Sequence, residues 1–358
     1  MREVREIGVH EAAMNETADV RLRRHSVNGQ QGSMHEKSVA HVAAEDARVA
    51  GEARYSYSST KIGFLVRCRE LYQLVRVSLR SQAEGAADTV RSVRKLEALV
   101  FERTGVRVEN LKVLEIGPGQ QLRHLRCFAL KNDVVGIDTD AIPQNLGLSG
   151  LLWTARHNPW MRTAKTIGRI ALGRDARFRA ALARELGVDK FEPLSVLQMD
   201  AKKMRFADQT FGFVFSSSVF EHIEEPRAAV EEVARVLRPG GVACISVHLY
   251  TSHSGQHDPS IFAAGGPVPP LWPHLRPAFA HTVRASAHLN RLSLQQWHEL
   301  FTTVMPGVHF AYGRDSADLS AALRQLRADQ ELSEYSDEEL LTVNLVAVWK
   351  KPETPGVA

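Results

Sequence analysis

Residues 111–122 read LKVLEIGPGQQL, and this stretch decides which kind of fold the sequence encodes. The largely apolar run from Val113 to Ile116 is typical of a short buried strand. Gly117 and Gly119 follow at once and provide a turn in which the backbone can approach a ligand closely. The stretch therefore predicts a strand that ends in a glycine turn, and this turn is a candidate cofactor site.

Strand and helix patterns alternate on both sides of this turn. Strands are expected at residues 133–138, 195–200, 211–218, 241–249, 308–312 and 340–351, and helices at 87–103, 122–130, 225–237 and 293–301. Alternation of this kind produces a mostly parallel sheet with helices on both faces. The sequence therefore predicts an α/β fold: a doubly wound, mostly parallel seven-stranded sheet of the Rossmann-like type, with helical and loop insertions.

The chain divides into a tail, a helical entry segment and one large domain. Residues 1–58 are polar and lack sustained periodicity, which is typical of a disordered tail. Residues 59–104 show helical patterns that lead into the domain, which we expect to span residues 105–358. Segments 141–190 and 249–290 interrupt the alternation. The second insertion is rich in Pro and Gly, as lids and binding loops are.

Composition excludes several classes of protein. Hydrophobic residues make up 44% and charged residues 24% of the chain, and no apolar run reaches the roughly 18 residues of a membrane span. The first residues lack the apolar segment of a secretory signal, so we expect a cytoplasmic protein. The three cysteines are far apart and form no CxxC pair, which argues against disulfides and a cysteine zinc site. A net charge of +4 is too small to indicate a nucleic-acid partner.

Positive charge gathers in two segments. Residues 61–81 place arginines between apolar positions at helical spacing, which fits contact with a membrane surface or an acidic partner. The alternative, which we favour, is a helix packed on the domain with solvated arginines. The insertion at 141–190 has nine basic and three acidic residues, so its local net charge is +6. This excess suits an acceptor that carries phosphate or carboxylate, and a solvated helical face explains it equally well.

The glycine turn departs from the dinucleotide-binding fingerprint. That fingerprint is GxGxxG, but Leu122 occupies its third glycine position, which argues against a nicotinamide cofactor. Glu115 lies two residues before Gly117, and this E-x-G-x-G pattern resembles motif I of the class I S-adenosylmethionine-dependent methyltransferases. The segments FGFVFSSSVFEHIEEP (211–226) and LRPGG (237–241) resemble the UbiE-like (type 11) branch of that family.

The resemblance extends from Leu111 to Val247 and implies a set of cofactor-binding residues. Two departures affect the shape of the site: Gly212, where aspartate is common in the family, and Gln121, where many members have a third glycine. The turn would hold the amino-acid end of S-adenosylmethionine, and carboxylates at two strand ends would hold its ribose and adenine. The implied residues are Glu115, Gly117, Pro118, Gly119, Asp138, Thr139, Asp200, Ala201, Ser216 and Ser217.

These residues also have purely structural interpretations. Asp138 ends a strand where a carboxylate can accept both ribose hydroxyls, and aspartate at such a position also caps turns and helices. We favour the ribose. In the resembled family, the acidic residue at the position of Asp200 binds the adenine amino group. The alternative is that Asp200 only stabilises a turn, as aspartates after strands commonly do. Backbone carbonyls near Ser216 and Ser217 are candidate acceptors for the ammonium group, with an ordinary loop as the alternative.

Methyl transfer to a hydroxyl group needs a base, and histidine has a suitable pKa. The candidates are His222, in the Glu-His pair after the fourth strand, and His253 and His257, in the loop after the fifth. The alternatives are a histidine that shapes the cofactor pocket and two surface histidines. His248 lies inside the strand and is expected to be packed. The HSGQHD segment brings His253, His257 and Asp258 to metal-ligand spacing, but no helix is expected to hold it, so we predict no metal site.

The resemblance and the candidate bases together imply an S-adenosylmethionine-dependent methyltransferase that methylates an oxygen atom of a small molecule or a glycan, and an acidic acceptor would suit the basic insertion. Trp153, Trp160 and Trp272 would stack on a sugar ring or anchor the insertions. Two other classes stay open: a non-catalytic module that keeps the fold and binds a partner through residues 61–81, and a nicotinamide-dependent oxidoreductase. The sequence leaves the oligomeric state open.

Overall fold

The computed structural model describes residues 82–140, 173–258, 270–283, 285, 287–314 and 319–353. The predicted tail (1–58), the basic helix (61–81) and most of the first insertion (141–172) lie outside the described residues. Trp153 and Trp160 therefore lie outside them as well. Among the helices that are described, none is both long enough and apolar enough to cross a membrane.

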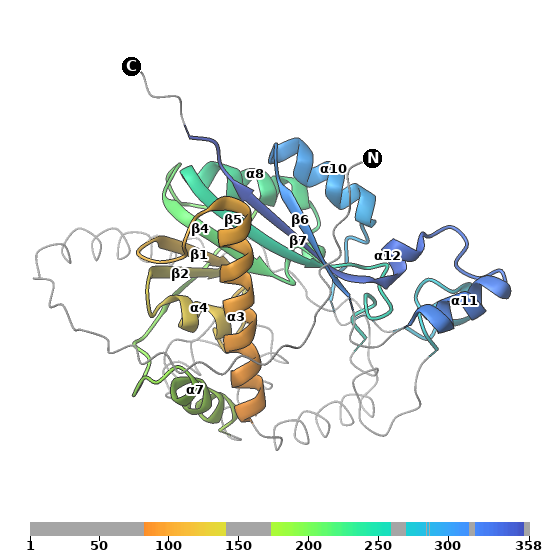
Figure 1. The fold of residues 1–358 in the computed structure, drawn as a ribbon, viewed down its shortest axis with the longest axis horizontal. Helices are drawn as coiled ribbons and strands as arrows, with labels where there is room; N and C mark the ends of the chain where they lie inside the picture. Colours follow the sequence, from red (N-terminus) through yellow and green to blue (C-terminus); the bar gives the residue numbers. More distant parts are fainter. Residues whose placement is uncertain are drawn as a thin grey trace, which may run out of the picture. The chain divides into compact units, whose positions relative to one another are not determined.

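The strands form one seven-stranded sheet with the order β3-β2-β1-β4-β5-β7-β6 (Figure 1). Their bounds are β1 Lys112–Ile116, β2 Asp133–Asp138, β3 Ser195–Gln198, β4 Phe211–Ser217, β5 Leu237–His248, β6 His309–Arg314 and β7 Thr342–Lys350. The first five strands are parallel, and β7 runs antiparallel to both of its neighbours. This architecture confirms the predicted fold class: a mostly parallel, Rossmann-like sheet.

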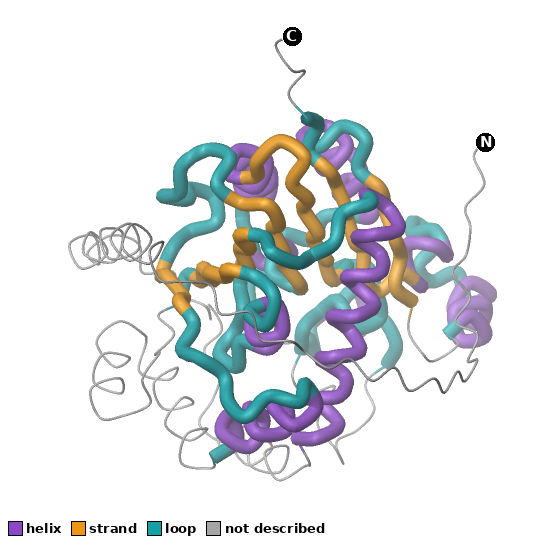
Figure 2. Tube along the Cα trace, turned by 60° about the vertical axis from the view of Figure 1, so that its left-hand side comes forward, coloured by secondary structure: helices purple, strands orange, loops and turns teal. Residues whose placement is uncertain are grey.

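Helices cover both faces of the sheet (Figures 1 and 2). Their bounds are α3 Gln82–Thr104, α4 Arg123–Phe128, α7 Arg174–Glu185, the 3-10 helix η1 Phe220–His222, α8 Pro226–Val236, α9 Pro277–Ala280, α10 Leu294–Val304, α11 Ser320–Ala328 and α12 Asp337–Leu341. One hydrophobic cluster joins residues of α3, α4 and α7 to β1, β4 and β5. Helix α8 packs against α10.

The core follows directly from the apolar patterns. On α3, Ala86, Val90 and Val93 recur at helical spacing and are buried against the sheet. On β4 every residue from Phe211 to Ser216 is buried, as expected of a central parallel strand with helices on both faces. The two cysteines in the described part of the chain, Cys127 and Cys244, are buried thiols.

Two predicted boundaries were wrong. The fifth strand was expected from residue 241, but β5 begins at Leu237, because Leu237 pairs with Phe211 before the register shifts and Val242 pairs with Phe213. The last strand was expected from residue 340, but α12 extends to Leu341. This short helix forms because its N-cap serine accepts a hydrogen bond from a backbone amide and its first turn is acidic, which suits a helix N-terminus.

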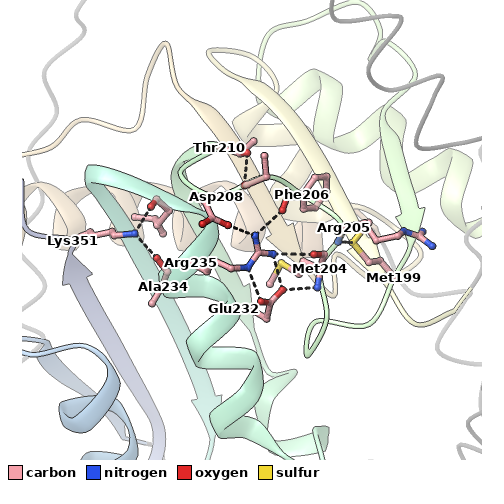
Figure 3. A network of polar contacts seen from close by, with 12 residues as sticks. Met199, Met204, Arg205, Phe206, Asp208, Thr210, Glu232, Ala234, Arg235 and Lys351 are labelled. Carbon is pink, nitrogen blue, oxygen red and sulfur yellow. Dashed lines mark hydrogen bonds and ion pairs between the residues drawn. The ribbon is translucent and has the colours of Figure 1, made fainter. Parts of the chain in front are cut away.

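A polar network holds the loop between β3 and β4 against α8 (Figure 3). The Arg235 guanidinium donates to both carboxylate oxygens of Glu232, at 2.7 and 2.8 Å, and to Asp208 at 2.7 Å. It also donates to the backbone carbonyls of Phe206 and Met204, at 2.8 and 2.9 Å. Because this loop begins at the end of β3, the network helps to fix the strand end at which the adenine is predicted to bind.

We predict that Arg235→Ala lowers the free energy of unfolding by about 2 kcal/mol, because it leaves several hydrogen bonds to charged groups unmade. Thermal unfolding followed by circular dichroism checks this, with Arg227→Ala, an exposed arginine on the same helix, as the matched control. Equal melting temperatures for the two variants would contradict a stabilising role for the network.

Candidate cofactor site and histidine cluster

The predicted cofactor residues meet at one edge of the sheet, where three neighbouring parallel strands end. Ile116 on β1 pairs with Ile137 on β2, and Asp138 pairs with Gln198 on β3. The Gly117 amide donates to the Ile137 carbonyl at 2.8 Å, and the Met199 amide donates to the Asp138 carbonyl at 2.9 Å. The carboxyl edge of a doubly wound sheet is where such folds bind ligands.

The two glycines of the turn are needed for different reasons. Both adopt left-handed backbone conformations, with φ of 68° at Gly117 and 61° at Gly119. A Cβ atom on Gly117 would lie 2.3 Å from Cγ2 of Val219, whereas a Cβ on Gly119 would meet no atom within 4 Å. Gly117 therefore allows the segment after β4 to pack against the turn, and Gly119 leaves open space beside it. Pro118 packs over Gly136 of β2.

Glu115 is a buried carboxylate without a full set of partners. Its side chain is 2% exposed, and Oε1 lies 3.5 Å from Nδ1 of His124. Oε2 is buried and accepts no hydrogen bond from the described residues. Burying a carboxylate oxygen without a donor is unfavourable, so the position suits a cationic ligand group such as an ammonium. The residues present thus fit the amino-acid end of S-adenosylmethionine.

The two aspartates at the strand ends both cap turns in the structure. Asp138 Oδ1 accepts from the Asp140 amide at 2.9 Å, and Asp200 Oδ1 accepts from the Lys202 amide at 2.8 Å. A carboxylate has about four acceptor positions on its two oxygens, so a turn hydrogen bond is compatible with a ligand hydroxyl or amino group as well. Thr139 is exposed and Ala201 is buried.

Ser216 and Ser217 lie beside the turn because β4 is the other neighbour of β1. Ser216 pairs with Ile116, and its hydroxyl donates to the Ile116 carbonyl at 3.0 Å. Ser217 pairs with Ser246 of β5. The Ser216 side chain therefore ties the end of β1 to β4, a structural role that sequence reasoning did not assign.

Three histidines form a cluster next to this edge. The ring centroids of His222 and His257 are 4.8 Å apart, and those of His248 and His257 are 4.7 Å apart. His222 ends η1, His248 ends β5, and His257 follows in a tight turn. The third predicted base, His253, instead packs edge-on toward Trp272, with centroids 6.3 Å apart. The structure thus brings two of the three candidates together and adds His248.

Burial keeps the clustered imidazoles neutral. It lowers the pKa of His257 to about 3 and that of His248 to about 4, and it also lowers the pKa of His222. The Nδ1–H of His222 donates to the His288 carbonyl at 2.8 Å, so the lone pair of this ring resides on Nε2. A neutral imidazole is suited to take a proton or to bind a metal ion through its unprotonated nitrogen.

Glu221 completes the cluster. It is 2% exposed, and neither of its carboxylate oxygens makes a hydrogen bond of regular geometry, although the backbone amides of Glu221 and His248 lie near it. Burial raises its pKa to about 8, and the nearby backbone amides of Glu221 and His248 offset this only in part. The ligand atoms of Glu221, His222 and His257 all lie within 4.8 Å of one another. The FEHI segment contained this signal, but only its histidine was singled out from the sequence.

The loop after β5 has its own small core. Trp272 is fully buried against Leu275, Leu323, Leu332 and Leu340, so this tryptophan anchors the second insertion. His274 lies nearby, and its Nε2–H donates to the Tyr250 carbonyl at 2.6 Å. Burial lowers the pKa of His274 to about 4.

Sequence comparisons place a methyltransferase domain in this region. Residues 161–245 match a family described as a methyltransferase domain. An uncharacterized methyltransferase from Mycolicibacterium gilvum is 34% identical over 64 residues, and a phosphatidylethanolamine N-methyltransferase from Cereibacter sphaeroides is 38% identical over 65 residues. Each alignment covers 18% of this chain, and the chain spans 25% and 31% of the length of these two relatives.

Solved structures that are similar to this chain include the YcgJ protein from Bacillus subtilis, which is 18% identical with a TM-score of 0.40, over 72% of this chain and 98% of that one. Phosphoethanolamine N-methyltransferase 2 from Haemonchus contortus, in complex with S-adenosyl-L-methionine, is 15% identical with a TM-score of 0.40. The match covers 72% of this chain and 53% of that one. The [4+2]-cyclase SpnF is 16% identical with a TM-score of 0.37, and the match covers 90% of this chain and 96% of that one.

The domain match and the strand-end site agree with each other. The matched methyltransferase domain supports S-adenosylmethionine as the cofactor. The buried oxygen of Glu115 and the open space beside Gly119 are the features of this chain that fit that cofactor.

The two glycines provide a test of the turn. We predict that Gly117→Ala lowers the melting temperature by several degrees, because the new Cβ collides with Val219 in addition to straining the backbone. Gly119→Ala, which adds only the strain, should lower it less while still weakening binding of S-adenosylhomocysteine. Differential scanning calorimetry and titration calorimetry measure the two effects. A smaller loss of stability in Gly117→Ala than in Gly119→Ala would contradict the assigned packing.

The buried His274 predicts a pH dependence of stability. Its pKa is about 4 in the folded chain and near 6.5 when unfolded, so the unfolded state takes up a proton first as the pH falls. The stability contributed by the neutral ring is complete above pH 6.5 and is lost between pH 6.5 and 4. At pH 5 the loss should be about 2 kcal/mol. His274→Gln should remove this dependence.

Urea unfolding of both proteins at pH 7.5 and pH 5 measures the effect. The wild-type protein should lose more stability on acidification than His274→Gln does. Equal losses in the two proteins would show that His274 titrates alike in the folded and unfolded states.

Proposed function

We propose that this protein is a cytoplasmic S-adenosylmethionine-dependent methyltransferase of the UbiE-like (type 11) branch that methylates a hydroxyl group of a small molecule or a glycan. The observation that carries the proposal is the meeting of three groups at one sheet edge: the glycine turn after β1, Asp138 after β2 and Asp200 after β3. The neutral histidine cluster lies at the next strand ends, after β4 and β5.

Each strand end has a distinct task in this proposal. Glu115 and the Gly117 turn would hold the amino-acid end of the cofactor, together with carbonyls near Ser216. Asp138, with Thr139 beside it, would accept the ribose hydroxyls, and the turn at Asp200 would bind the adenine. When bound, S-adenosylmethionine supplies a methyl group on a sulfonium that is activated for in-line displacement.

The histidine cluster favours an acceptor that must lose a proton. An alcohol or phenol oxygen becomes a competent nucleophile when a base takes its proton, and neutral imidazoles near the reacting atoms can do so at neutral pH. His222 and His257 are the proposed bases, because burial leaves both neutral. His253, which lies toward Trp272, is proposed as an outer residue of the acceptor loop.

The first insertion supports an acidic acceptor. Gln121, in the glycine turn, donates from Nε2 to Asp175 of α7 at 3.2 Å, so this helix reaches the cofactor edge. Helix α7 includes four arginines, Arg174, Arg177, Arg179 and Arg184. A phosphate or carboxylate on the acceptor would complement this charge. We propose no nucleic-acid partner, and a peripheral membrane contact through residues 61–81 remains a further part of the proposal.

A second candidate is methylation of an amine. The observation that favours it is the similarity of 65 residues to a phosphatidylethanolamine N-methyltransferase, a protein named for methylation at nitrogen. An uncharged amine already has a lone pair and needs a base only to remove a proton after or during transfer. The two candidates therefore differ in how much turnover depends on the histidines.

The first experiment is a calorimetric titration of the full chain with S-adenosylhomocysteine, run beside NADH. We expect S-adenosylhomocysteine alone to bind, and Asp138→Ala to weaken its affinity at least tenfold because a ribose acceptor is lost. Asp133→Ala, an exposed aspartate at the other end of β2, is the matched control and should bind like wild type. NADH binding would favour the oxidoreductase, and binding of neither ligand would favour the non-catalytic module.

Turnover then separates the acceptors. Mass spectrometry of mixtures with sugars, phenols, sugar phosphates and aminoalcohol headgroups would identify the methylated product. Methylated hydroxyls, with turnover lowered by His222→Ala or His257→Ala at unchanged cofactor affinity, would support the first candidate. Methylated amines would support the second.

A further inference from the structure

We propose that Glu221, His222 and His257 form a binding site for a divalent transition-metal ion. The site contains two imidazoles and one carboxylate, a donor set that suits Zn²⁺ and other first-row divalent ions and leaves coordination positions for further ligands. It differs from the set that the HSGQHD spacing suggested, because His257 meets Glu221 and His222 from another segment of the chain.

The geometry is close to that of a bound site. One ligand atom from each side chain lies within 4.8 Å of the other two. Ligands bound about 2.1 Å from a tetrahedral ion lie about 3.4 Å apart, so side-chain movements of about 1 Å would complete the set. Movements of this size need no rearrangement of the backbone.

The state of Glu221 is an independent observation that points to a ligand. It is 2% exposed, and neither oxygen makes a hydrogen bond of regular geometry; the backbone amides of Glu221 and His248 are its nearest polar neighbours outside the cluster. Buried carboxylates in folded proteins are paired, hydrogen-bonded or bound to metal ions. A carboxyl group that donates to an imidazole would be the simplest alternative, and no such bond joins Glu221 to His222 or His257. A cation between the three side chains would give this carboxylate a partner.

The surroundings hold the ligands in place. The Nδ1–H of His222 donates to the His288 carbonyl at 2.8 Å, which is the outer hydrogen bond that orients metal-binding histidines. Asn290 fixes η1, because its side-chain amide donates to the carbonyls of Phe220 and Ile223 at 2.8 and 3.0 Å. The backbone amide of Asn290 also donates to the backbone carbonyl of Glu221 at 2.9 Å.

The third ligand is positioned by a tight turn. His257 has a left-handed conformation with φ of 49°, and it follows Gly255, where a Cβ atom would lie 2.1 Å from the Tyr250 carbonyl oxygen. Only glycine allows this turn to form, and the turn brings the His257 ring to His222. The sequence between β5 and His257 therefore serves to deliver this imidazole to η1.

The position suggests a task for the ion. Val219 packs on Gly117, and η1 begins at the next residue, so the proposed metal site adjoins the cofactor turn. An ion there would bind the acceptor oxygen and lower the pKa of its hydroxyl group. This part of the inference rests on the proposed function, whereas metal binding itself does not.

Metal titration of the full chain tests the inference. After dialysis against a chelator, wild-type protein should bind one Zn²⁺ per chain in a calorimetric titration. Bound Co²⁺ should show the visible absorption bands of an ion with a low coordination number. Glu221→Gln, His222→Gln and His257→Gln should each weaken Zn²⁺ binding at least tenfold. Their melting temperatures establish whether they fold. Glu221→Gln preserves the shape of the side chain, so it keeps the test valid if a histidine variant does not fold.

Two controls give the experiment its discrimination. His253→Gln should leave Zn²⁺ affinity unchanged, and a loss in this variant would overturn the proposed ligand set in favour of His253, His257 and Asp258. His309→Gln, at an exposed histidine on β6, controls for surface histidines. Absence of Zn²⁺ binding by wild type, or unchanged binding by Glu221→Gln, would overturn the proposal.

Titration of the metal-free protein with S-adenosylhomocysteine separates this inference from the proposed function. Binding of S-adenosylhomocysteine without Zn²⁺ binding overturns the metal site alone. Zn²⁺ binding that the three variants weaken, without S-adenosylhomocysteine binding, supports the metal site and overturns the proposed function.

Discussion

The contact between Gly117 and Val219 is the constraint on which the site depends. The turn after β1 and the segment after β4 approach so closely that no side chain fits between them. This approach puts the glycine turn beside η1, so the groups proposed to hold the cofactor adjoin the groups proposed to act on the acceptor. A larger residue at position 117 would separate these two sets, whatever its effect on the turn itself.

Two buried carboxylates lie on either side of that contact. Glu115 precedes the glycine turn, and Glu221 follows Val219, and both are 2% exposed with at least one oxygen that accepts no hydrogen bond. Such groups destabilise a folded chain, and they persist at sites where a ligand completes their interactions. The aromatic core of the sheet, where Phe128 packs edge to face against Phe213 and Phe215, contributes stability that offsets this cost.

The local parts of this arrangement could be predicted from the sequence, and the parts that join distant segments could not. Strand β2 was predicted at its observed bounds, because its apolar pattern and flanking polar residues are local signals. Glu221 was passed over, because a carboxylate next to a histidine says nothing about its burial. His222 and His257 are 35 positions apart in the sequence, and no local pattern indicates that they meet. The start of β5 was missed for the same reason, since Leu237 joins the strand only through its partner Phe211.

The histidine cluster follows from topology once the strand order is known. Strands β4 and β5 are neighbours and parallel, so η1, which follows β4, and the loop that follows β5 must begin at the same edge of the sheet. Burial at that edge acts on the two kinds of side chain in opposite directions: it lowers the pKa of His257 and raises that of Glu221. The same desolvation thus keeps imidazole and carboxyl groups uncharged together, which is the state in which a buried cluster is least unfavourable. A cation or an acceptor proton that enters the cluster then meets a neutral imidazole lone pair on Nε2 of His222.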